Sequence, residues 1–220
     1  MAQMVAYQTD TSDMLIPHGL FRSAFDNTAP VIAAVAPEDA KHRAEVFSYF
    51  DNLLRFLDSH HGSEDALLWP VLLERTPAAE LVGRMEGEHE EIHAHRVRAG
   101  ELLDAWSASA AGSTAQQLVD GLTGLRLTLT VHFRAEEAHI LPLASRYMSP
   151  EEWGALAGHS MATFTGDKLW LILGLIFEQM NGAQVAATLM MLPPPVVAMW
   201  TSGGKTAFED FIARVRPSAS

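Results

Sequence analysis

The chain has 220 residues, which suits one well-packed domain, or one domain with an appended subdomain, and is too short for two large domains. Its 27 Asp and Glu residues outnumber its 15 Lys and Arg residues, and the net charge of −12 disfavours a nucleic acid or an anionic membrane as partner. Cysteine is missing, which excludes disulfides and thiolate metal sites and fits a reducing cytoplasm. Ten histidines remain as candidate metal ligands.

The distribution of apolar residues suggests neither export nor a membrane anchor. The amino terminus has no basic region followed by an apolar one, as a secretory signal would. The longest strongly apolar run, residues 169 to 177, is far shorter than the roughly 20 residues that span a bilayer. We therefore expect a cytoplasmic protein without a membrane segment.

Helical spacing of apolar residues begins near residue 12 and predicts four long helices. We expect them at about 13 to 30, 37 to 75, 77 to 106 and 113 to 147, the last with a bend at Pro142. Short connections between long helices favour an all-α, up-down four-helix bundle, which we place in residues 1 to 148.

A capping box, Ser149 with Glu152, then opens a series of shorter helices. Glycines and a run of three prolines at 193 to 195 interrupt this segment. We assign residues 149 to 220 to a C-terminal helical extension that packs on the bundle or forms a homodimer surface.

Polar residues interrupt the core-facing stripe of the second helix. Steps of four and three residues from Val46 to Val71 give apolar positions except at His60 and Glu64. The fourth helix repeats this pattern 72 residues later, where His132, Glu136 and His139 face inward. The segments HHGSEDALLWP and HFRAEEAHILP therefore look like two copies of one functional turn.

The remaining two helices carry inward histidines as well. His18 interrupts the apolar stripe of the first helix, and His89 that of the third, with His93 one turn beyond it. A single core histidine is more often a hydrogen-bonded packing residue than a ligand. Two buried glutamates, however, would cost several kcal/mol each without compensation, and the stripes hold no lysine or arginine. The combination predicts a metal site between the four helices.

Residues 10 to 147 resemble the hemerythrin-like, or HHE cation-binding, family. The resemblance lies in His18 within DMLIPHGLF, in the two turns just described, and in EHEEIH with its two histidines. It implies two iron ions joined by an oxo or hydroxo bridge. The implied ligands of one iron are His89, His93 and His132, those of the other are His18 and His60, and Glu64 and Glu136 bridge the two.

Two positions leave alternatives open. Oxygen-carrying members use a carboxylate five residues after the last histidine, which here is Glu137, whereas the internal repeat favours Glu136. We choose Glu136 as the bridge. His139 is interpreted as a residue of the second coordination shell. His159 could serve as an eighth ligand or as a gate, but we favour a packing role and leave it out of the predicted site. We place His42, His61 and His95 on solvated or flanking faces.

The resemblance implies that O2 or another small diatomic or peroxide ligand binds at an open iron position, for storage, delivery or sensing. Five imidazoles, two bridging carboxylates and one bridging oxygen fill eleven of the twelve positions of two six-coordinate irons. The alternative is an enzyme that decomposes hydrogen peroxide or processes nitric oxide, for which His139 would be a proton relay. A third is an iron or redox sensor that acts through a protein partner. The same ligands would also hold manganese or zinc.

Overall fold

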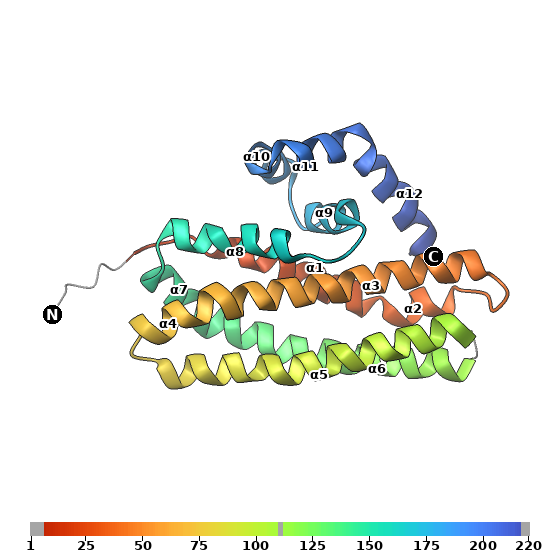
Figure 1. The fold of residues 1–220 in the computed structure, drawn as a ribbon, viewed down its shortest axis with the longest axis horizontal. Helices are drawn as coiled ribbons and strands as arrows, with labels where there is room; N and C mark the ends of the chain where they lie inside the picture. Colours follow the sequence, from red (N-terminus) through yellow and green to blue (C-terminus); the bar gives the residue numbers. More distant parts are fainter. Residues whose placement is uncertain (1–6, 110–111, 217–220) are drawn as a thin grey trace.

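The computed structural model describes residues 7–109 and 112–216 of the chain (Figure 1). Residues 1–6, part of the amino terminus considered above, lie outside the described residues. The described chain is helical and contains no β-strand, so the predicted all-α fold is confirmed. None of its helices combines the length and the apolar character that crossing a membrane requires.

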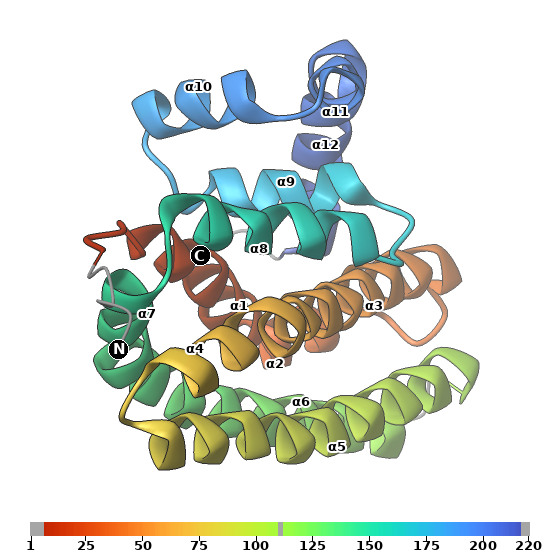
Figure 2. The same ribbon diagram turned by 60° about the vertical axis from the view of Figure 1, so that its left-hand side comes forward.

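Four helical rods that run alternately up and down form the bundle (Figures 1 and 2). Their elements are η1 (Ser12–Met14), α1 (Leu15–Asp26) and α2 (Thr28–Ala33); α3 (Ala40–Ser63), η2 (Glu64–Leu68) and α4 (Trp69–Arg75); α5 (Ala79–Ser109); and α6 (Gly112–Ala135), η3 (Glu136–Ile140) and α7 (Leu141–Tyr147). These bounds follow the predicted ones closely. The third helix starts at Ala79, because the Thr76 hydroxyl accepts a hydrogen bond from the Ala78 N–H in a separate turn before it.

The predicted apolar stripes meet in the core of the bundle. Side chains from α3 and α6 are at most 2% exposed at every stripe position before the polar residues: Val46, Phe50, Leu53, Leu57, Leu118, Leu122, Leu125 and Leu129. Burial of this apolar surface provides the main stabilisation of the bundle. It also forms a rigid frame for the polar residues that follow on the same stripes.

A π-helical turn interrupts each of the two repeated rods at its glutamate. In η2 the N–H of Trp69 donates to the carbonyl of Glu64, and in η3 the N–H of Leu141 donates to the carbonyl of Glu136. The next residue is a proline in both copies, which cannot donate to the carbonyl four residues before it and would clash with it. The wider turn accommodates one extra residue, as π-helical turns do.

The extra residue changes which side chains face the core after each glutamate. Leu68 and Leu72 are fully buried, where the stripe predicts Leu67 and Val71. In the second copy, Ile140 is buried and His139 is exposed. The inward position predicted for His139 is therefore wrong, because an α-helical register was extended through a π-helical turn.

Beyond the bundle, the chain continues in further helices: α8 (Pro150–Thr163), α9 (Leu169–Phe177), α10 (Gly182–Met191), α11 (Pro194–Met199), η4 (Trp200–Gly204) and α12 (Lys205–Val215). The predicted capping box of Ser149 and Glu152 is present at the start of α8. α8 and α9 lie along α3 and α1, whereas α10 and α11 lie on the side away from α5 and α6 (Figures 1 and 2).

Hydrogen bonds join the segment before η1 to the end of the fourth rod. The Thr9 hydroxyl donates to the Met148 carbonyl at 2.6 Å, and the Ser145 hydroxyl donates to the Thr9 carbonyl at 2.6 Å. The Thr9 N–H in turn donates to the Ser145 carbonyl at 2.9 Å. The described start of the chain thus lies beside the point where the bundle ends.

Candidate metal centre

The four rods bring histidines and two glutamates together at the middle of the bundle. α1 provides His18, α3 provides His60, α5 provides His89 and α6 provides His132. Glu64 and Glu136 are the first residues of the two π-helical turns and are both fully buried. The structure thus brings together six of the seven side chains predicted to be ligands.

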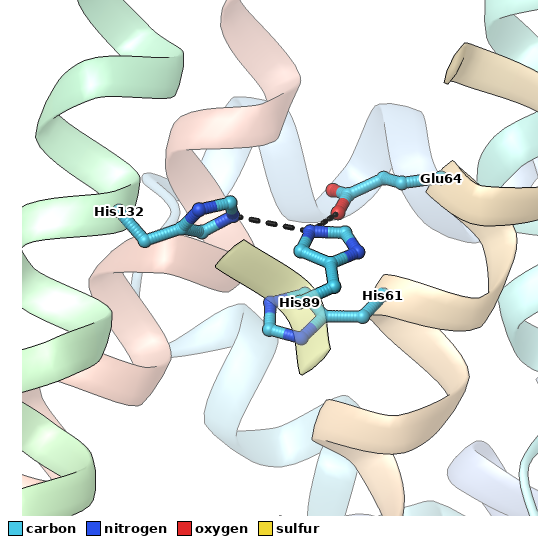
Figure 3. Close-up of side chains that lie close together, drawn as sticks. All are labelled: His61, Glu64, His89 and His132. Atoms are coloured by element: carbon cyan, nitrogen blue, oxygen red, sulfur yellow. Dashed lines mark hydrogen bonds and ion pairs between the residues drawn. The ribbon is translucent and has the colours of Figure 1, made fainter. Parts of the chain in front are cut away.

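One group of these residues lies between α3, α5 and α6 (Figure 3). One nitrogen or oxygen atom from each of its four side chains lies within 4.8 Å of those of the other three: His61, Glu64, His89 and His132. The Nε2 atoms of His89 and His132 are 3.2 Å apart, and Glu64 Oε2 lies 3.5 Å from His89 Nε2. Three imidazoles and a carboxylate are a ligand set that suits a transition-metal ion.

A second group lies on the other side of Glu64 and contains His18 and His60. Glu64 Oε1 is 3.3 Å from His60 Nε2, whereas Glu64 Oε2 faces His89. The two oxygens of one carboxylate therefore face two different ligand groups. A carboxylate placed in this way could contact a metal ion in each group.

Glu136 occupies a comparable place between the two groups. Its Oε2 atom lies 3.2 Å from His18 Nε2 and 3.8 Å from His132 Nε2. Glu137, the alternative bridge, points away from the centre and accepts hydrogen bonds from His18 Nδ1 and from Arg22, both at 2.8 Å. The geometry thus favours Glu136 over Glu137 as the inward carboxylate.

Buried atoms without hydrogen-bond partners test whether these residues fit metal ions. Among the described residues they include both oxygens of Glu64 and of Glu136 and the Nε2 atoms of His18, His60 and His61. Such atoms would cost several kcal/mol in a protein interior if nothing compensated them. These glutamate and histidine atoms lie in the two groups or, for Glu136, between them, so cations there would supply the missing charge and the missing partners.

The pKa values of the protein without metal agree with this interpretation. Burial, together with the charges of neighbouring Glu136 and Asp65, raises the pKa of Glu64 well above its usual value. Burial lowers the pKa of His60 to about 3 and that of His61 well below the usual value. These imidazoles are thus neutral near pH 7, which is the form that binds metals.

The pKa values of His18 and Glu136 reflect their mutual attraction. Burial opposes the charged form of both groups, yet the carboxylates of Glu136 and Glu137 raise the pKa of His18. The charge of His18 lowers the pKa of Glu136 to about 2. In the protein without metal, His18 and Glu136 therefore favour each other's charged form.

Three outer carboxylates fix the orientation of the imidazoles. Nδ1 of His89 lies 2.6 Å from Asp65, that of His18 2.8 Å from Glu137, and that of His132 3.1 Å from Glu88. A carboxylate only accepts, so Nδ1 carries the proton and Nε2 is left with its lone pair toward the centre. These carboxylates hold each ring in the tautomer that a metal ion requires.

The internal repeat makes the centre nearly twofold symmetric. Asp65 and Glu137 are equivalent positions, and each fixes a histidine from a neighbouring rod, His89 and His18 respectively. His61 is equivalent to Phe133. His61 stacks on His89 at 4.3 Å between ring centroids, and Phe133 stacks on His18 at 4.0 Å. The two copies thus differ at this position, where one has an imidazole and the other has a phenyl ring.

Two further histidines differ from the prediction. His93, predicted to be a ligand, is exposed on α5 and belongs to neither group. His61, which the sequence analysis placed on a solvated or flanking face, is buried and takes part in the first group. The reason is that α3 packs against α5 as well as against α8, so the residue after His60 also faces a neighbour, His89 of α5.

The other histidines lie outside both groups. His42, His95 and His159 are half-buried, and His159 is on α8, outside the four rods. Asp65 and Glu88 were not among the predicted site residues. The internal repeat is the signal that could have identified Asp65, because it aligns that residue with Glu137.

Comparison with known proteins assigns the bundle to a family. The family model of the hemerythrin HHE cation binding domain matches residues 11–144, which extend from η1 into α7 and include every residue of the two groups. No curated protein and no solved structure gives a significant match. With its bundle fold, its buried His and Glu cluster and this match, the chain belongs to the hemerythrin HHE cation-binding family.

Proposed function

We propose that the protein holds two iron ions between its four rods and binds O2 reversibly beside His18 and His60. The unequal number of imidazoles on the two sides of Glu64 carries this proposal. Three imidazoles, two bridging carboxylate oxygens and one bridging oxygen would fill six positions on one side. With only two imidazoles, the other side would keep one position for an external ligand.

The surroundings of His18 and His60 support an uncharged ligand. Phe133 stacks on His18, and the rings of Phe21 and Phe56 lie 5.7 Å and 6.4 Å from that of His60. His18 is fully buried. An apolar wall of this kind favours a small apolar molecule such as O2 over an anion, which would lose its hydration there.

The residues of this side would hold the ligands and exclude water, while bound ferrous ions would supply the electrons that O2 accepts. Glu137, itself held by Arg22, keeps the proton of His18 on Nδ1. Phe133 keeps solvent from the ring face of His18. A histidine-rich shell is less anionic than one built of carboxylates, which supports reversible cycling between the ferrous and ferric states.

Metal analysis and O2 titration test this function. Protein purified without added iron is expected to contain about two irons per chain. After anaerobic reduction, addition of O2 should produce a visible absorption band that disappears when O2 is removed. Absence of iron, or a band that deoxygenation does not reverse, would contradict the proposal.

The same sample distinguishes O2 binding from an enzyme acting on hydrogen peroxide. Rapid peroxide turnover would favour the enzyme. The suggested proton relay for that chemistry was His139, and this residue is exposed and makes no hydrogen bond among the described residues. The observations therefore favour O2 binding.

A further inference from the structure

A groove of about 700 Å³ lies between α3 and α5. It is next to the first ligand group, on the opposite side of Glu64 from the group that contains His18 and His60. His61 and His89, two members of the first ligand group, lie along it. The groove thus connects solvent with the part of the centre that has three imidazoles.

Glycines keep the groove open. Gly62 on α3 and Gly83 and Gly87 on α5 all lie along it. A Cβ atom added at any of the three would meet no heavy atom within 4 Å. These positions border open space, which larger side chains would occupy.

The groove carries uncompensated negative charge. Asp58 pairs with Arg96, and Asp65 accepts a hydrogen bond from His89. Glu86 and Glu90 are exposed. Neither carboxylate makes a hydrogen bond or an ion pair with another residue between 7 and 109 or between 112 and 216. Two unpaired carboxylates at the opening attract cations and repel anions.

His61 links the groove to the buried centre. This side chain is only 7% exposed, it lies along the groove, and its Nε2 atom has no hydrogen-bond partner among the described residues. A buried imidazole nitrogen without a partner suits a metal ion as ligand. The exposed His93 lies along the same groove, further from Glu64.

We propose that the α3–α5 groove is the route by which a divalent metal ion reaches the buried centre. Glu86 and Glu90 attract the hydrated ion, and the unpartnered Nε2 of His61 is the first buried ligand that it meets. The inference rests on the proposed function in one respect, namely that the centre holds metal ions.

The uptake rate of Co²⁺ by metal-free full-length protein tests the route, because bound Co²⁺ absorbs visible light. At low ionic strength, E86Q/E90Q should slow uptake on the order of fivefold without changing the final Co²⁺ content. High salt should remove most of this difference, since it screens exposed charges. The matched control is E91Q/E151Q, which removes two exposed carboxylates outside the groove and should load at the wild-type rate.

A steric variant tests the route independently of charge. Gly87→Leu fills open space in the groove and should slow Co²⁺ uptake severalfold at both low and high salt. Equal uptake rates in wild type, E86Q/E90Q and Gly87→Leu would overturn the groove as the route while leaving the metal centre intact. Failure of the wild type to take up any Co²⁺ would instead overturn the metal centre itself.

Discussion

At the scale of single residues, two equivalent positions of the internal repeat decide the coordination of the centre. His61 follows His60, and Phe133 follows His132. An imidazole at the first position completes a group of three, whereas a phenyl ring at the second leaves His18 and His60 as a pair. In the proposed centre, the difference between a saturated and an accessible metal position would thus depend on one side chain.

Alanine variants of two histidines test which of them is a metal ligand. The structure places His61 in the first group, whereas the family resemblance implies His93. His61→Ala should reduce the metal content from about two ions per chain toward one, because it removes a buried imidazole from the first group. His93→Ala should retain both ions, because His93 is exposed. The measurement is metal analysis of both proteins. The reverse result would mean that metal binding draws His93 inward and that His61 is a packing residue.

Variants of the two neighbouring glutamates distinguish a ligand from a residue that orients one. Glu136→Ala should lose most of the bound metal, since it removes a buried carboxylate between the two groups. Glu137→Ala should weaken metal binding about 10- to 100-fold, the usual effect of removing a hydrogen-bond partner of a ligand.

Glu137→Gln is the matched control, because an amide oxygen still accepts a hydrogen bond from His18 Nδ1. It should bind metal nearly as well as the wild type in a competition titration. If Glu137→Ala loses more metal than Glu136→Ala, the choice of Glu136 as the bridge is wrong.

Stripe analysis of the sequence placed His18, His60, Glu64, His89, His132 and Glu136 in one site, and the structure brings all six together. It worked because a buried carboxylate at a core position has few physical explanations. It failed at His61, since one stripe per helix describes a single buried face. A helix that contacts neighbours on two sides buries a wider face, and sequence spacing does not show which positions lie on it.

At the scale of elements, the two π-helical turns determine how each rod passes the centre. Each begins at a glutamate and ends before a proline, and each moves the downstream residues by one position around the helix axis. The sequence predicted a bend at Pro142 but not the extra residue. Hydrophobic spacing did contain a signal, because Leu68 and Leu72 continue the stripe as well as Leu67 and Val71 do.

Cysteine labelling can test the register after the π-helical turn, because the chain has no cysteine of its own. His139→Cys should react rapidly with a maleimide, since residue 139 is exposed. Ile140→Cys should react on the order of a hundredfold more slowly, because residue 140 is fully buried and must wait for local opening. Equal or reversed rates in the folded protein would show that the α-helical register continues through Glu136.

At the scale of the whole molecule, the extension is held to the bundle by apolar contacts, hydrogen bonds and ion pairs, among them a bidentate pair. Leu171, Ile172 and Leu175 of α9 are buried in the same core as the bundle residues. Arg75 at the end of α4 donates hydrogen bonds to both oxygens of Glu152 on α8, at 2.9 Å and 2.7 Å. We propose residues 149 to 220 as a C-terminal helical extension that packs on the bundle.

The Arg75–Glu152 pair gives a pH-dependent contribution to stability. The hydrogen bonds from Arg75, followed by that from the Ser149 N–H, lower the pKa of Glu152 to about 2 from its ordinary value of 4.5. A carboxyl with a lowered pKa in the folded state stabilises the fold above its unfolded pKa, and this contribution is lost as the pH falls through about 2. Both side chains are about one third exposed, so the contribution is at most about 1 kcal/mol.

Arg75→Gln should therefore lower the free energy of unfolding by up to about 1 kcal/mol at pH 7, and the difference from wild type should narrow between pH 4.5 and pH 2. Urea denaturation of the metal-free proteins at several pH values measures this difference in the free energy of unfolding. Arg98→Gln, which removes a more exposed pair with Glu101, is the control and should change stability less. A difference that grows toward acid pH would rule out the pair as its source.

The hydrogen bonds between Thr9 and the segment from Ser145 to Met148 have a consequence for chain order. They place the beginning and the end of the bundle side by side, so its backbone follows an almost closed ring from which the extension branches. Chains with adjacent ends tolerate being joined there and cut elsewhere. The centre depends on which rods are neighbours and not on which comes first, so a circularly permuted bundle would keep it.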